Sequence, residues 1–170
     1  NVLRGATSCR LSDVEANAAA EQVTDYDPFD NTYGPVMLRS ISQRHQEWLQ
    51  ANDRRSRLRV LWRKFFDSVD ALISPIMATP AFPHIRGISK QDQCLDVDNV
   101  QQPISDTYFW IGLASAAYLP ATLAPVGVSR GGLPIGMQII GPEAHDRRCI
   151  ALAEMLEQGF RGFTPPPGYD

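Results

Sequence analysis

The sequence predicts an α/β protein, and three observations lead to that class. Of the 170 residues, 44% are hydrophobic, a fraction with which a chain of this length can bury a core. Apolar residues recur at helical spacing over residues 58–69. Short apolar runs bounded by proline or glycine, at residues 71–74, 121–128 and 135–140, are typical of buried strands. Helices that flank buried strands indicate the α/β class.

The N-terminal part of the chain is expected to hold one short helix and a polar loop. Ser12, with Glu15 three residues later, fits a capping box, so a helix begins here and continues to Gln22. Residues 24–33 are rich in Asp and indicate a surface loop. Pro35 suits the first turn of the long helix that follows, or of a short helix before it.

The most clearly patterned element is a long helix that is predicted to end near Ser68. Its apolar residues stand at i, i+3, i+4, i+7, i+8 and i+11, and they are Leu58, Leu61, Trp62, Phe65, Phe66 and Val69. One stripe of this kind is the pattern of an amphipathic helix. Arginines recur at i+4 away from that stripe: Arg55, Arg59 and Arg63. We interpret them as a solvated helix face rather than a phosphate site.

The second half of the chain is expected to alternate strands and helices. A short buried strand at residues 71–74 is followed by a long loop over residues 76–102. Asp106 fits the N-cap of an apolar helix at residues 107–117, and Pro120 prevents that helix from continuing.

The C-terminal elements are a predicted hairpin and a last helix. The strands at 121–128 and 135–140 are joined by a glycine-rich turn, so we expect them to pair as antiparallel neighbours. Asp146 fits the N-cap of the last helix, and Gly159 stands where helices often end in glycine. The proline-rich segment 164–168 is predicted to be extended.

Charge and composition argue against two classes of partner. The formal net charge of -3 and the pI of about 5.6 lack the basic face that nucleic-acid binding needs, so we expect no nucleic-acid partner. Residues 107–129 carry no charge and are long enough to be considered as a membrane span. Pro120 and Pro125 interrupt this stretch, so a buried helix followed by a buried strand explains it better, and we expect no membrane partner.

The cysteines indicate a cellular compartment, and the first residue indicates how the chain arises. Cys9, Cys94 and Cys149 are far apart and odd in number, so we expect free thiols and a reducing, cytoplasmic compartment. The chain begins at Asn1 without a signal-peptide pattern, and we interpret it as processed or cut from something longer.

One local motif matches a catalytic pattern, but its context does not. Residues 127–131 spell Gly-x-Ser-x-Gly, the nucleophile-elbow pattern, around Ser129. An elbow needs a helix after the serine, whereas a strand is predicted here, so we interpret the motif as a hairpin turn. His45, His84 and His145 share no metal-ligand spacing, and there is no glycine-rich phosphate loop. We therefore expect neither a metal nor a cofactor, and the residues alone give no catalytic set.

The apolar helix at residues 107–117 opens with three aromatic residues, Tyr108, Phe109 and Trp110. Two interpretations remain open for this cluster. It packs into the core, or it forms a wall of an apolar pocket.

Several sequence motifs also occur in one order. They are Leu119-Pro120-Ala121 with Pro125 and Gly127, Gly132-Leu133-Pro134 with Gly136, Gln138 and Gly141, the run Thr79-Pro80-Ala81-Phe82-Pro83-His84, and the tail Pro165-Pro166-Pro167-Gly168-Tyr169. Together with the helix and strand of residues 57–75, they resemble the amidase signature hydrolases over nearly the whole chain.

The resemblance implies a large α/β fold with a mixed central sheet wrapped by helices, of which residues 1–170 form a single C-terminal portion. It implies hydrolysis of carboxamides by a Ser–Ser–Lys triad whose motifs lie in the family's N-terminal part. No Gly-Gly-Ser-Ser run occurs here, and the only lysines are Lys64 and Lys90, so no catalytic residue is carried over. The implied partners are the missing N-terminal part and a small-molecule amide. Assembly into a homo-oligomer is a further alternative.

The resemblance further implies that the helix before the Leu-Pro-Ala strand approaches the acyl side of the substrate. The candidate pocket residues are Tyr108, Trp110, Ile111 and Ser115. Two positions depart from the family pattern, because many relatives have Asn in place of Ser115 and Gly in place of Tyr118. A noncatalytic, stand-alone binding or assembly module with an amidase-like fold is the alternative.

Overall fold

The computed structural model describes residues 2–89, 92–160, 162–165 and 168–169. The chain divides into two compact units, residues 1–58 and 59–170. The interpretation of the chain as one portion of a larger domain stays a prediction. The last two turns of helix α4 belong to the second unit.

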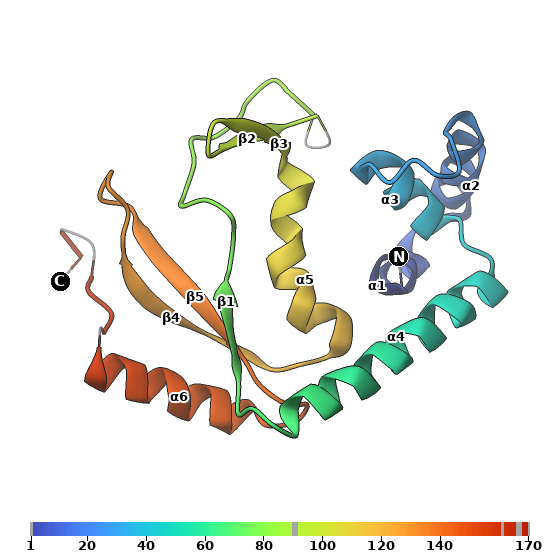
Figure 1. The fold of residues 1–170 in the computed structure, drawn as a ribbon. Helices are drawn as coiled ribbons and strands as arrows, with labels where there is room; N and C mark the ends of the chain where they lie inside the picture. Colours follow the sequence, from blue (N-terminus) through green and yellow to red (C-terminus); the bar gives the residue numbers. More distant parts are fainter. Residues whose placement is uncertain (1, 90–91, 161, 166–167, 170) are drawn as a thin grey trace. The chain divides into compact units, whose positions relative to one another are not determined.

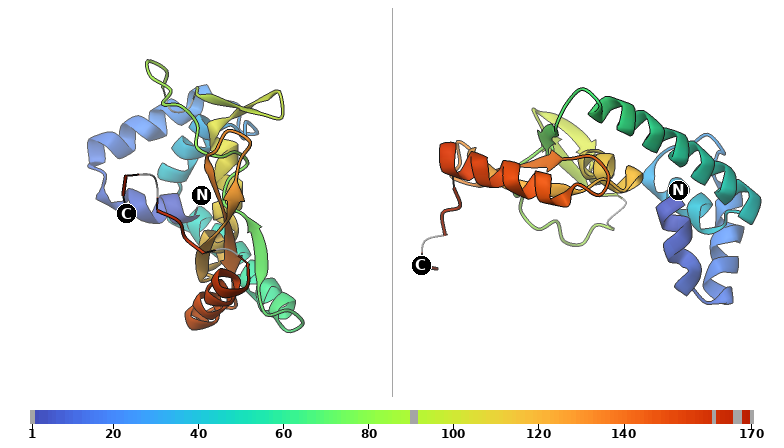
Figure 2. Two further views of the ribbon diagram at one scale, coloured as in Figure 1. Left: turned by 90° about the vertical axis from the view of Figure 1, so that its left-hand side faces the viewer. Right: turned by 90° about the horizontal axis from the view of Figure 1, so that it is seen from below.

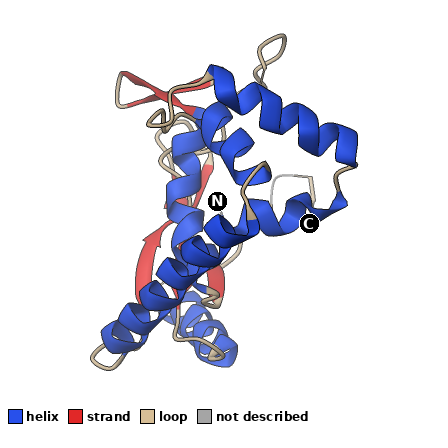
Figure 3. Cartoon of the chain, turned by 90° about the vertical axis from the view of Figure 1, so that its right-hand side faces the viewer, coloured by secondary structure: helices blue, strands red, loops and turns tan. Residues whose placement is uncertain are grey.

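All the regular structure described in the first unit is helical (Figure 3). In chain order its elements are α1 (Val2–Thr7), η1 (Ser8–Arg10), α2 (Asp13–Gln22), η2 (Val23–Asp25), α3 (Tyr33–Ile41) and the first part of α4 (His45–Phe66) (Figure 1). The predicted capping box is confirmed. The backbone N–H of Glu15 donates to the Ser12 hydroxyl, and the backbone N–H of Ser12 donates to the Glu15 carboxylate.

One detail of the first unit differs from the prediction, because the expected loop at 24–33 begins with a 3-10 turn. Pro35 lies in the first turn of a separate short helix, α3, which is one of the two alternatives predicted for it. Helix α1 lies close to α4, because the indole N–H of Trp48 donates to the Val2 carbonyl at 3.0 Å. A Cβ atom on Gly5 would lie only 2.9 Å from the Trp48 ring, so glycine permits this approach.

The second unit contains the strands and two further helices. Its elements are β1 (Leu72–Pro75), β2 (Cys94–Val97), β3 (Val100–Pro103), η3 (Ile104–Thr107), α5 (Tyr108–Ala117), β4 (Ala121–Val128), β5 (Pro134–Ile140) and α6 (Asp146–Gly159). One sheet has the order β1-β5-β4, and β2 pairs with β3 in a second sheet. All of these pairings are antiparallel. The α/β class is confirmed.

The core of the second unit lies where β5 runs between β1 and β4. Ile139 and Ile140 point to opposite faces of the sheet, yet both are at most 1% exposed. Helix α6 packs mainly on β4 and also on β5, and α5 lies on the other side of the sheet (Figures 1 and 2). Both faces of the central strand are therefore covered.

Three expectations for the second unit are corrected. The predicted loop 76–102 contains the β2–β3 hairpin, whose turn residues Asp98 and Asn99 have φ values of 54° and 66°. Asp106 is not the N-cap of α5, because it lies inside the 3-10 turn that precedes the helix. Asp146 is likewise the first residue of α6 rather than its N-cap.

Smaller differences concern helix and strand ends. The first strand is shifted by one residue, to Leu72–Pro75, and Gly159 is the last helical residue of α6 rather than the residue after it. Part of the predicted extended tail, residues 166–167, lies outside the described residues. In the part of the chain that the structure describes, no helix is both long and apolar enough to cross a membrane.

Candidate functional site

Helix α5 is held against the sheet by a buried glutamine on β5. Gln138 is 3% exposed, and its side-chain amide donates to the carbonyl of Trp110 at 2.8 Å and to that of Pro75 at 3.0 Å. One amide group thereby joins α5, β5 and the end of β1. A polar group so deeply buried is stable only when it is hydrogen-bonded, so this contact fixes the position of α5.

The helix presents one uncharged stripe away from the sheet. Successive residues turn by about 100°, so Ala114 and Ala117, which are 6% and 0% exposed, mark the side that faces the sheet. Tyr108, Ile111 and Ser115 stand at i, i+3 and i+7, within about 60° of one another around the helix. Tyr108 and Ser115 are turned away from the two alanines, and Ile111 lies at the edge next to Ala114. We call these three residues the outward stripe. Ile111 is 42% exposed, and Ser115 is exposed as well.

The four pocket residues proposed from the sequence therefore do not all share one face. Trp110 is half-buried and turns toward the side of Ala114 and Ala117, which faces the sheet. The Ser115 hydroxyl donates to the Ile111 carbonyl at 2.9 Å, so its proton is already used within the helix. A role of these residues in substrate binding stays a prediction.

The motif residues around the hairpin have packing roles. The N–H of Gly141 donates to the Pro120 carbonyl at 3.0 Å, which joins the two ends of the hairpin. A Cβ on Gly141 would lie 2.5 Å from the sulfur of Cys149, so only glycine fits there. Cys149 is fully buried, and burial raises the pKa of its thiol above the ordinary value. This thiol is a packing group and a poor nucleophile.

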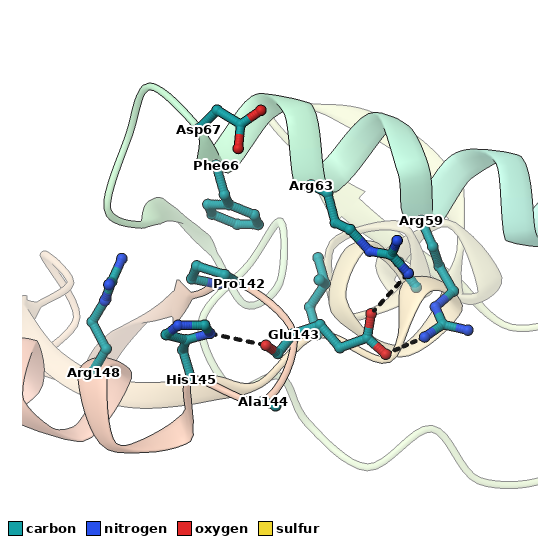
Figure 4. Close-up of a pocket in the computed structure, with 11 residues that line it drawn as sticks. Arg59, Arg63, Phe66, Asp67, Pro142, Glu143, Ala144, His145 and Arg148 are labelled. Atoms are coloured by element: carbon teal, nitrogen blue, oxygen red, sulfur yellow. Dashed lines mark hydrogen bonds and ion pairs between the residues drawn. The ribbon is translucent and has the colours of Figure 1, made fainter.

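A cavity of about 650 Å³ lies between the last turns of α4 and the segment that joins β5 to α6 (Figure 4). Its lining residues are Arg59, Arg63, Phe66, Asp67, Ala117, Leu119, Pro142, Glu143, Ala144, His145 and Arg148. The Glu143 carboxylate pairs with Arg59 and lies 3.7 Å from Arg63. Nδ1 of His145 lies 2.9 Å from the Glu143 carbonyl oxygen. The charged groups thus largely satisfy one another, which is typical of a structural network.

A second cavity, of about 610 Å³, lies between the proline-rich loop and the β2–β3 hairpin. Leu95, which is 5% exposed, and Phe82 contribute apolar surface to it. His84 and Cys94 both line this cavity, but both are exposed. The amide of Gln93 donates to the Ile88 carbonyl at 3.1 Å and helps to hold the loop in place.

The structure also tests the catalytic interpretations. Ser129 lies in the turn between β4 and β5, where its backbone N–H donates to the Leu133 carbonyl and its hydroxyl accepts from the Leu133 N–H. No helix follows the serine, so the hairpin interpretation is confirmed and the elbow is excluded. All three cysteines are free. Among the described residues, no cluster of three or more His, Cys, Asp or Glu could hold a metal ion.

Among the described residues, no lysine takes the place of the base that the resemblance implies. Lys64 is exposed on α4, and Lys90 lies outside the described residues. Sequence reasoning missed both Gln138 and the Arg59–Glu143 pair. The signal for Gln138 was available, because it is the only polar side chain in the strand Pro134–Ile140.

Comparison with solved structures identifies the fold. A structure described as a vestigial protein complex that reveals the evolutionary origins of an s-triazine catabolic enzyme matches 96% of this chain and 35% of its own, with a TM-score of 0.66 and 19% identity. A glutamyl-tRNA(Gln) amidotransferase subunit from Thermotoga maritima matches 97% of this chain and 32% of its own, with a TM-score of 0.58 and 19% identity. At these identities the likeness shows the fold alone, which is the α/β fold of amidase-type proteins.

Sequence comparison gives the family. The model of the amidase family matches residues 10–150, which is most of the chain, so the chain belongs to the amidase family. A glutamyl-tRNA(Gln) amidotransferase subunit of Methylocella silvestris is 31% identical over 105 residues, which is 62% of this chain and 20% of that protein. The chain spans about a fifth of the length of the curated relatives it matches.

Proposed function

We propose that this chain is the C-terminal portion of an amidohydrolase that cleaves carboxamide C–N bonds, and that it supplies scaffold and pocket wall rather than the catalytic groups. Membership of the amidase family supports the reaction class. The short share of the relatives' length supports the role of a portion. The absence of a Gly-Gly-Ser-Ser run from the sequence supports a catalytic centre located elsewhere.

The chemistry of the parent enzyme would follow Ser–Ser–Lys catalysis. One serine attacks the amide carbonyl, a second serine relays protons to an unprotonated lysine, and backbone donors stabilise the oxyanion. All of these groups would come from an N-terminal part outside this sequence. This chain would contribute the outward stripe of α5, against which the acyl group of a small amide would lie.

The observation that carries the proposal is the uncharged character of α5. None of its residues, Tyr108–Ala117, carries a charge, as in helices that are buried on all sides, yet Phe109 is 62% and Ile111 is 42% exposed. The outer edges of β1 and β4 also have no strand partner among the described residues. Exposed apolar surface and open edges of this kind usually mark an interaction site. We infer that the N-terminal part covers them.

Three further properties of the parent remain proposals. Free cysteines are consistent with a reducing, cytoplasmic compartment. The acidic pI is consistent with a small neutral substrate, and it argues against a nucleic-acid partner. Two relatives are named as subunits of an amidotransferase, so assembly into a complex or a homo-oligomer is open for the parent.

The test is a comparison of two purified proteins on simple aliphatic and aromatic amides. The 170-residue chain should show no hydrolysis, because loss of a catalytic set costs several orders of magnitude in rate. The protein that carries this segment together with its N-terminal part should hydrolyse at least one amide. Hydrolysis by the short chain that Ser129→Ala abolishes would overturn the proposal. A short chain that is a monodisperse monomer and binds no hydrophobic dye would favour the stand-alone module.

A further inference from the structure

Helix α5 ends in a left-handed residue that is not glycine. Tyr118 has φ 59° and ψ 34°, and its backbone N–H donates to the Ala114 carbonyl, as does that of Leu119 at 3.1 Å. Glycine occupies such positions without a steric penalty, whereas a Cβ atom brings one. The Tyr118 ring is 51% exposed, so burial of the ring does not offset that penalty.

The ring of Tyr118 instead forms one face of a charged contact. The guanidinium carbon of Arg59 lies 5.3 Å from the ring centroid, within the range of a cation–π interaction. The same guanidinium donates to the carboxylate of Glu143. The Arg59 and Glu143 side chains are only 25% and 34% exposed. The pair is therefore partly shielded from water, and electrostatic contacts are stronger in such surroundings than in bulk water.

This contact joins three segments of the second unit: the end of α4, the end of α5 and the segment after β5. Gln138 already holds α5 at Trp110. Tyr118 lies eight residues further along the chain, about 12 Å along a helix axis. Two attachments at that separation fix both the rotation and the axial position of the helix.

We propose that Arg59 is a positioning residue for α5, which acts through the Tyr118 ring and Glu143 and sets where the outward stripe stands. This inference rests on the proposed function, because the stripe matters only as a pocket wall. Arg59 itself would touch no substrate. Arg63 is the matched comparison on the same helix, since it is 64% exposed and reaches Glu143 only at 3.7 Å.

The first test is a double-mutant cycle in the 170-residue chain. Arg59→Gln and Tyr118→Leu should each lower the melting temperature by about 2–4 °C, and the double variant should fall no further than the lower of the two. Amides 114–119 should exchange faster in both variants while those of β5 are unchanged. Tyr118→Phe should retain the ring and with it the coupling to Arg59, and Arg63→Gln should have little effect. Additive losses, or equal changes in exchange throughout the unit, would overturn the proposal.

The second test uses the longer protein with its N-terminal part. Arg59→Gln should change the ratio of kcat/KM between a bulky and a small acyl amide by about tenfold, while kcat on the small amide stays near that of the unmodified enzyme. Arg63→Gln should leave the ratio unchanged. An unchanged ratio with Arg59→Gln would reduce the contact to a structural one and overturn the positioning role. If the unmodified enzyme hydrolyses no amide, the proposed function fails together with that role, whereas the coupling in the cycle would stand on its own.

Discussion

The second unit contains two neighbouring regions of opposite character. Along the hairpin, contacts within the chain hold the family motif residues in place. The Gln138 side chain donates two hydrogen bonds, and Gly141 lies against the buried Cys149. On α5, the outward stripe carries no charged side chain, and Ile111 and Ser115 within it are exposed. The hairpin motif residues that resemble the amidase family therefore hold this unit together. The region with unused apolar surface is the better candidate for contact with substrate.

The largest effect is expected at Gly141. Gly141→Ala would place a Cβ 2.5 Å from the sulfur of Cys149, and such overpacking costs about 1–3 kcal/mol of unfolding free energy. Urea denaturation of the chain measures it. The same change at Gly159, where nothing lies within 4 Å, should leave stability equal or higher. Adding Cys149→Ala to Gly141→Ala should restore part of the loss, and a failure to do so would contradict the close packing.

The next effect is expected at the glutamine that holds α5. Gln138→Leu should lower the free energy of unfolding by about 1–2 kcal/mol, because it deprives the Trp110 and Pro75 carbonyls of their side-chain donor. The matched control is Gln158→Leu on the exposed side of α6, which should change stability little. Equal effects at the two glutamines would show that the buried amide does not hold α5.

A smaller and opposite effect is expected on the open side of α5. Gly112 has no atom within 4 Å of a Cβ position, so Gly112→Ala should stabilise the isolated chain by roughly 0.5–1 kcal/mol through helix propensity. In the longer protein the same change should weaken activity, because the added methyl group meets whatever covers the helix. A substitution that destabilises the isolated chain would mean that another part of this chain already covers α5.

The smallest effect concerns the capping box of the first unit. Hydrogen bonds from the backbone and hydroxyl of Ser12 lower the pKa of Glu15 below its ordinary value of 4.5. Because the pKa is lower in the folded state than in the unfolded state, the ionised carboxylate stabilises the helix at pH values above the unfolded-state pKa. This contribution is lost as the pH falls through the folded-state pKa. Amide exchange in α2 should therefore accelerate, relative to the base-catalysed trend, as the pH falls below the ordinary value of 4.5. In Glu15→Gln that acid-dependent loss should be absent, and its persistence would assign the effect to another group.

Local signals account for the parts of the fold that the sequence predicted well. The capping box of Ser12 and Glu15 and the two β4–β5 runs are decided by neighbouring residues, and both are confirmed. The β2–β3 hairpin was missed because its turn uses Asp98 and Asn99 in place of the more usual glycine. The start of α5 was predicted one residue early, at residue 107, and Asp106 was wrongly taken as its cap because a 3-10 turn precedes the helix.

The candidate site was predictable only in part. Helical spacing alone places Tyr108, Ile111 and Ser115 on one stripe, and the same spacing could have set Trp110 apart from them. The contact between Arg59 and Glu143 could not be predicted, because 84 residues separate the two positions and only the folded arrangement brings them together.

The central claim is that the outward stripe of α5 lines the acyl pocket of an amidase, and Ile111 and Trp110 test it most directly. In the longer protein, Ile111→Ala should shift the preference between bulky and small acyl amides by about tenfold at nearly unchanged stability. Trp110→Ala should instead lower the melting temperature, because its side chain turns toward the sheet. A stability loss with unchanged acyl preference for Ile111→Ala would contradict the claim.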